Sequence, residues 1–114
     1  MTETQQAPFR FQFNSSNNLD AGADIAERTE EQVRQRLRRV AGDITRAEVH
    51  ASDVTGQNGP RTFRVRMEVR PSFTGPVTVH HEAPRLDLAV AGACDKALTA
   101  LQREQGKRTS RKGH

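Results

Sequence analysis

The chain contains no tryptophan or tyrosine, one cysteine and no long run of apolar residues. With only 33% hydrophobic residues, it must build a thin core from Val, Leu, Ala and Phe. The single thiol, Cys94, cannot form a disulfide within the chain, which favours a reducing compartment and a small buried side chain. No stretch approaches the roughly 18 apolar residues of a membrane span, and the polar start lacks the apolar part of a signal peptide. We therefore expect a cytoplasmic protein with no membrane anchor.

Motifs for catalysis or for cofactor binding are missing as well. The glycines occur singly, and none begins the Gly-Lys-Ser/Thr sequence of a phosphate-binding loop. His80 and His81 are neighbours, and neighbouring side chains on a strand point to opposite faces, so they cannot chelate one metal ion together. His50 and His80 can share a face, where we interpret them as hydrogen-bonding surface groups and not as a catalytic pair. The sequence predicts no enzymatic activity, no metal, no other cofactor and no small-molecule substrate.

Residues 62–71 show the most informative pattern in the chain. Apolar and charged side chains alternate there: Phe63, Val65, Met67 and Val69 with Arg64, Arg66, Glu68 and Arg70. The alternation predicts a strand with one buried and one mostly cationic face, as is typical of antiparallel sheets with one open side. A cationic face indicates an anionic partner, although a solvated face that only maintains solubility would show the same pattern.

The periodicity of the remaining segments predicts one domain, at residues 9–105, between a flexible segment at 1–8 and a disordered basic tail at 106–114. The expected elements are a strand at 9–13, a helix at 25–40 that stops at Gly42, strands at 44–54, 62–71 and 77–80, and a helix from Leu86 with the apolar stripe Leu86, Val90, Ala93, Ala97 and Leu101. The predicted fold class is therefore α+β, in the order β-α-β-β-β-α. Both helices should pack on one face of a four-stranded sheet whose last three strands form an antiparallel meander.

Positive charge is concentrated in most of this domain. The formal charge is +4, but residues 1–33 hold two arginines and six carboxylates, or −4, so residues 34–114 carry +8. Basic clusters of this kind indicate contact with nucleic acid, and arginine suits phosphate. Since Phe73 is the one candidate for an exposed aromatic ring, we expect recognition of RNA backbone and shape instead of base stacking. The candidate RNA-binding residues are Arg36, Arg39, Arg64, Arg66, Arg70, Lys96, Arg103, Lys107, Arg108, Arg111 and Lys112.

Three features together resemble one known family. The opening strand runs into Asn17-Asn18-Leu19, the elements follow the order given above, and the alanine-rich stretch 87–98 contains the pair Asp95-Lys96 before further basic residues. Over residues 9–112 the chain resembles a short form of the ribosome hibernation-promoting factors, also called ribosome-associated translation inhibitors or sigma-54 modulation proteins.

The resemblance implies a fold similar to a double-stranded-RNA-binding domain with an added strand. It also implies a domain that binds the small ribosomal subunit and its rRNA, in the channel where mRNA and tRNA would pass, and blocks translation in idle ribosomes. Lys96, Arg103 and Lys107 match the basic edge of the family's last helix, and Arg64 and Arg66 match its third strand. A second small hibernation factor is a further candidate partner.

Two other functions remain open from the residues themselves. The same basic faces would suit a general double-stranded-RNA-binding domain. The acidic start of the first helix would instead suit a protein-interaction module that modulates a transcription factor.

Overall fold

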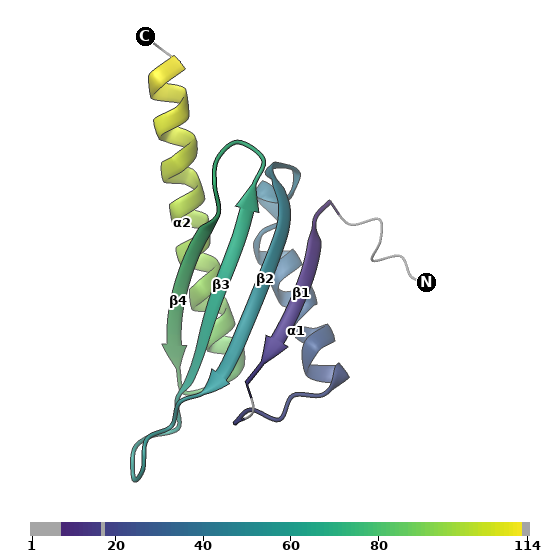
Figure 1. Cartoon of the computed structure of the whole chain (residues 1–114), viewed down its shortest axis with the longest axis vertical. Coiled ribbons are helices and arrows are strands. Elements are labelled where there is room, and N and C mark those ends of the chain that lie inside the picture. Colours follow the sequence, from purple (N-terminus) through teal and green to yellow (C-terminus); the bar gives the residue numbers. More distant parts are fainter. Residues whose placement is uncertain (1–7, 17, 113–114) are drawn as a thin grey trace.

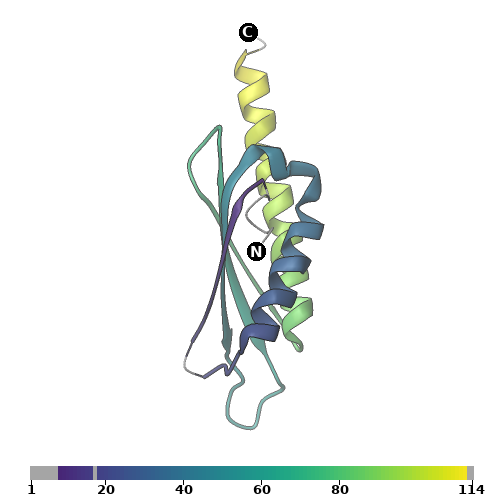
Figure 2. The same ribbon diagram turned by 90° about the vertical axis from the view of Figure 1, so that its right-hand side faces the viewer.

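The computed structural model describes the backbone of residues 8–16 and 18–112, and it shows a sheet covered on one face by helices (Figures 1 and 2). The elements are β1 (Arg10–Ser15), α1 (Ala23–Arg36), the 3-10 helix η2 (Arg38–Asp43), β2 (Ile44–Asp53), β3 (Phe63–Pro71), β4 (Val77–Ala83) and α2 (Leu86–Lys112). The predicted α+β class and element order are confirmed. Of the segment predicted to be flexible, 1–8, all but Pro8 lies outside the described residues.

The sheet has the order β1-β2-β3-β4. β2, β3 and β4 pair antiparallel, which confirms the predicted meander. β1 pairs parallel with β2, because α1 and η2 carry the chain back along the helical face before β2 begins. The sheet is therefore mixed, and β1 and β4 are its two edges.

The centre of the core lies on the inner face of β3. Val65, Met67 and Val69 are completely buried, and α2 packs over β3 and β4 (Figure 2). Complete burial of such a side chain contributes about 1.5–3 kcal/mol. The predicted apolar stripe of α2 faces this surface, with four of its residues buried: Val90, Ala93, Ala97 and Leu101. None of the helices within the described residues combines the length and apolarity that a bilayer crossing requires.

The first helix ends earlier than the sequence predicts. α1 stops at Arg36, and the amide of Leu37 donates to the carbonyl of Val33. The chain then tightens into η2, in which Val40 bonds to the carbonyl three residues before it. Gly42 does not adopt the positive φ of a helix-stop glycine. Burial of Leu37 fixes the junction, so packing and not the glycine decides where the α-helix ends.

The second helix is longer than predicted. α2 continues through Gly106 to Lys112, so residues 106–112 have a helical backbone where the sequence predicts a disordered tail. Four of its seven residues are lysine or arginine, which favour helices, and it contains no proline. This end of α2 projects beyond the sheet (Figure 1).

Close packing of α2 on β4 depends on one glycine. A Cβ atom added at Gly92 would lie 2.0 Å from the ring of His81, which points from β4 toward the helix. The sheet and the helix can therefore approach as they do only with no side chain at this position.

We expect Gly92→Ala to lower the free energy of unfolding by about 1–3 kcal/mol, because overpacking outweighs the better helix propensity of alanine. Urea denaturation would measure this change. Gly106→Ala is the matched control, since nothing lies within 4 Å of its added Cβ, and it should stabilise the protein by up to about 1 kcal/mol. In a His81→Ala background, Gly92→Ala should no longer lower the free energy of unfolding. An unchanged loss of stability would contradict the contact between position 92 and the His81 ring.

Candidate nucleic-acid interface

The face of the sheet that points away from the helices carries polar side chains arranged in rows across the strands. Since residues two apart share a face, the strand register aligns these side chains from one strand to the next. The first row is Arg10-Arg46-Arg70, the second Gln12-Glu48-Glu68-Thr78, the third Asn14-His50-Arg66-His80 and the fourth Ser52-Arg64-Glu82.

Each glutamate on this face has an arginine partner. The guanidinium of Arg64 lies 2.7 Å from the carboxylate of Glu82. The corresponding distance is 3.5 Å both for Arg70 with Glu68 and for Arg46 with Glu48. Ion pairs at such exposed positions contribute about 0–1 kcal/mol, but they offset the local charge. Two of the predicted binding residues, Arg64 and Arg70, are therefore partly neutralised.

Arg66 differs from the other arginines of β3. Its side chain is exposed, and it forms no ion pair within residues 8–16 and 18–107, whose side chains the structure describes. Its register partners are His50 on β2 and His80 on β4. Within this described part of the chain, the third row therefore contains a cation that has no ion pair and lies between two imidazoles.

The cationic surface continues around the edge of β4. Nζ of Lys96 donates to the backbone carbonyl of His80 at 2.7 Å, which places the ammonium at the free edge of the strand. Lys96 and Arg103 line a shallow cleft between α2 and Val79 of β4. We refer to Arg66, His80, Lys96 and Arg103 as the β4 strip, because they form one path from the sheet face to the outer side of α2.

The other predicted residues do not join this strip in the same way. Arg36 lies against Asp95 of α2, at 3.4 Å, and Arg39 is exposed on η2. Lys107 follows Arg103 by one turn of α2 and lies 3.5 Å from Glu104. The backbone of α2 includes three further predicted residues whose side chains are outside the described part: Arg108, Arg111 and Lys112.

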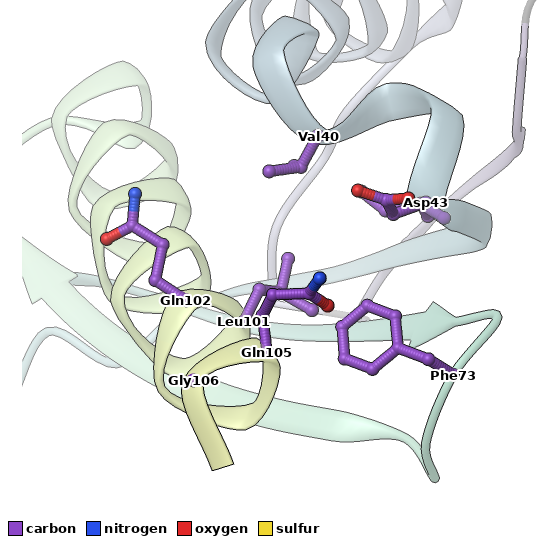
Figure 3. A pocket seen from close by; sticks show the side chains of 8 residues that line it. Val40, Asp43, Phe73, Leu101, Gln102, Gln105 and Gly106 are labelled. Atoms are coloured by element: carbon purple, nitrogen blue, oxygen red, sulfur yellow. The ribbon is translucent and has the colours of Figure 1, made fainter. Parts of the chain in front are cut away.

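An apolar cavity of about 540 Å³ lies at the base of the projecting part of α2. Figure 3 shows Phe73, from the connection between β3 and β4, opposite Leu101 and Gln105 of α2. Val40 and Asp43 of η2 form another side. Since no lysine or arginine is among the described residues that line the cavity, it is chemically distinct from the β4 strip.

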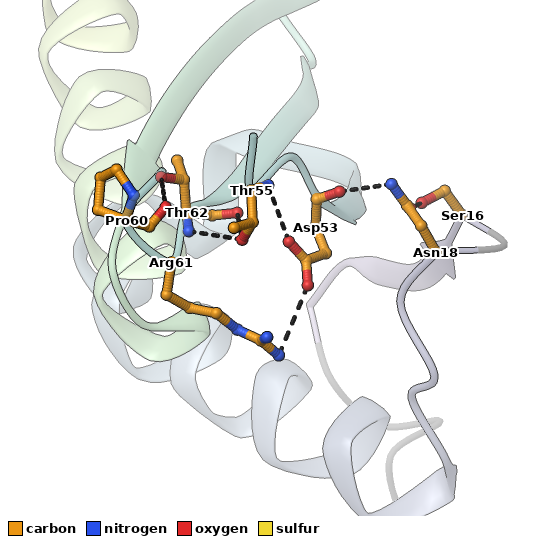
Figure 4. A network of polar contacts seen from close by, with 7 residues as sticks. All are labelled: Ser16, Asn18, Asp53, Thr55, Pro60, Arg61 and Thr62. Atoms are coloured by element: carbon orange, nitrogen blue, oxygen red, sulfur yellow. Dashed lines mark hydrogen bonds and ion pairs between the residues drawn. The ribbon is translucent and has the colours of Figure 1, made fainter. Parts of the chain in front are cut away.

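The connection between β2 and β3 is held by a polar network around Asp53 (Figure 4). The Thr55 amide donates to its carboxylate at 2.9 Å, and the Arg61 guanidinium lies 3.5 Å from it. Hydrogen bonds from the side chain and the backbone of Thr55, with the charge of Arg61 in addition, lower the pKa of Asp53. The Asn18 side chain donates to the Asp53 carbonyl and so ties the segment after β1 to the hairpin.

The sequence pattern predicts neither this network nor a binding role for His50 and His80. Their place in the alternating pattern could have indicated such a role, because His50 and His80 lie on the same face of the sheet as Arg66. The network around Asp53 leaves no periodic signal, since it joins a turn to a loop 35 residues earlier in the chain.

Comparison with known proteins gives a consistent result. A family model described as "Sigma 54 modulation protein / S30EA ribosomal protein" matches residues 14–109. The N-terminal domain of Protein Y from Thermus thermophilus has 23% identity and a TM-score of 0.64, over 83% of this chain and 97% of that one. A ribosomal subunit interface protein from Coxiella burnetii has 14% identity and a TM-score of 0.69, over 86% and 99% of the two chains. A comparison with curated proteins finds no match.

At these identities the two solved structures show the fold of the chain. They agree with a four-stranded mixed sheet and two helices. The expected likeness to a double-stranded-RNA-binding domain stays a prediction.

We expect the contacts of Asp53 to weaken in acid. Because the pKa of Asp53 is lowered from 3.8, the stabilisation they provide is present above that value and is lost as the pH falls through the folded-state pKa. The chemical shift of the Thr55 amide, followed by NMR, should report a transition below 3.8. Asp53→Asn should abolish the transition, and a midpoint at or above the ordinary value would contradict the network.

Proposed function

Because the chain belongs to the sigma 54 modulation protein / S30EA ribosomal protein family, a group of ribosome-associated modulation factors, we propose that it blocks the mRNA and tRNA channel of the small subunit in idle ribosomes. The observation that carries this proposal is the extent of the family match. Residues 14–109 include β2, β3 and β4, most of α2 and the whole β4 strip. The protein would act by occupying the channel and would turn over no substrate.

The chemistry of the β4 strip supports contact with ribosomal RNA. An exposed guanidinium with no ion pair in the described residues can form two parallel hydrogen bonds to a phosphate. Lys96 and Arg103 add two cations along the neighbouring cleft. A line of separate phosphate contacts follows the backbone of a folded RNA without reading its bases.

Arginines that are paired in the free protein can take part as well. Exposed pairs such as Arg64 with Glu82 are weak, so an RNA phosphate can compete with the carboxylate for the guanidinium. The same holds for the ion pairs of Arg70 with Glu68, Arg36 with Asp95 and Lys107 with Glu104. We propose that Arg39, Arg108, Arg111 and Lys112 contribute at the outer margins of the interface.

This proposal places the protein in the cytoplasm, where translation takes place, with the small subunit and its rRNA as partners. A second small hibernation factor would then act on the same ribosomes. The proposal also separates the chain from a general duplex-RNA binder, which would hold an isolated RNA duplex as tightly as it holds a small subunit.

The first test is binding of the purified chain to small ribosomal subunits by co-sedimentation. If about six phosphates are contacted, affinity should fall about a thousandfold between low and moderate salt. Added mRNA and tRNA should displace the protein at low salt. Binding that is unaffected by both ligands would contradict occupation of the channel, and equal affinity for a free RNA duplex would favour the general binder.

The second test is reversal of charge in the β4 strip. Arg66→Glu with Lys96→Glu should weaken subunit binding on the order of tenfold to hundredfold and should flatten its salt dependence, because two phosphate contacts are lost. Arg28→Glu with Arg38→Glu changes the net charge equally on the exposed surface of α1 and η2, and it should weaken binding much less. Circular dichroism would establish that both variants are folded. Equal losses in the two variants would show that net charge alone matters.

A further inference from the structure

The third row of the open sheet face brings two histidines to the sides of Arg66. His50 is its partner on β2 and His80 its partner on β4. Adjacent strands are about 4.8 Å apart, so one anion placed over Arg66 lies within reach of all three side chains. Arg66 and His80 are exposed and His50 is half-buried, which leaves the row open to a ligand.

The surroundings of the row do not neutralise it. His50 is faced by Asn14 of β1, by Glu48 and Ser52 of its own strand and by Arg66. His80 is faced by Thr78 and Glu82 of its own strand, by Arg66 and by Lys96 of α2, which contacts its carbonyl.

The carboxylates among these neighbours already have partners. Glu48 accepts a hydrogen bond of 2.8 Å from Asn14 and lies near Arg46. Glu82 is paired with Arg64, and Glu68, two residues after Arg66 on β3, is paired with Arg70. Among the described residues, no carboxylate therefore neutralises the positive charge of the row, and this charge can attract an anionic ligand.

We infer that His50, Arg66 and His80 form a phosphodiester-binding row whose affinity for RNA increases as the pH falls from about 8 to about 6. The inference rests on the proposed function, because it names how the same surface binds the RNA backbone. Histidine changes charge in this range of pH. Like charges side by side on a bare sheet are unfavourable, so an anion over Arg66 is what makes three cations in one row stable. By linkage, binding of RNA then takes up protons.

His81 provides an internal contrast. It follows His80 in the sequence but points to the other face, where its ring packs against Gly92. The two adjacent histidines therefore have separate roles: one faces the proposed RNA surface, and the other helps to pack β4 under α2.

The test compares dissociation constants for purified small ribosomal subunits at about pH 6 and about pH 8 and at constant ionic strength. For the wild-type chain we expect binding to tighten on the order of fivefold at the lower pH, as two added charge contacts would give. His50→Gln with His80→Gln should lose this increase. Ser52→Gln with Thr78→Gln places the same amides two residues away on the same strands and should keep it.

The outcomes separate this inference from the proposed function. The inferred role of the row would be wrong if the affinity still increased at the lower pH in the double histidine variant, or if it did not increase in the wild type. If the folded wild type does not bind subunits at either pH, the proposed function fails. Fluorescence anisotropy with a short labelled RNA duplex then tests whether the row binds RNA. A duplex affinity that rises in acid through His50 and His80 would support it, and absence of that rise or of duplex binding would overturn it.

Discussion

Burial of one face of β3 beneath α2 is the interaction on which the rest of the structure depends. Val65, Met67 and Val69 are fully buried, and each contributes about 1.5–3 kcal/mol. Because side chains on a strand alternate, the same burial forces Arg64, Arg66 and Arg70 to the open face. A shift of one residue would place arginine in a thin core, so the hydrophobic pattern fixes the cationic surface as firmly as it fixes the core.

Local carboxylates then determine which of these cations are available. Glu68 and Glu82 lie beside Arg70 and Arg64, whereas Arg66 has histidines on both sides. A simple count of basic residues therefore overstates the unpaired charge of the sheet. The charge left over follows the edge of β4 to Lys96 and Arg103, and this path connects the two elements that the core interaction holds together.

Gly92 links this surface to the core. The absence of a side chain there lets the His81 ring lie against α2, and the close approach of helix and strand lets Lys96 reach the carbonyl of His80. Packing on the inner side of β4 thus sets the position of a cation on its outer edge. The family match covers both features, because Gly92 and Lys96 lie within residues 14–109.

The sequence by itself determined the fold class, the element order, the antiparallel meander and the inward face of each strand, because these follow from periods of two and of three to four residues. It did not determine the end of α1, where the buried Leu37 outweighs Gly42, or the continuation of α2 through Gly106. Only the tertiary structure decided that Arg66 has no ion pair among the described side chains, that His50 and His80 lie beside it, and that Lys96 reaches the edge of β4. These relations join residues 14 to 16 positions apart on different elements, and strand register and helix packing, which no local pattern records, bring them together.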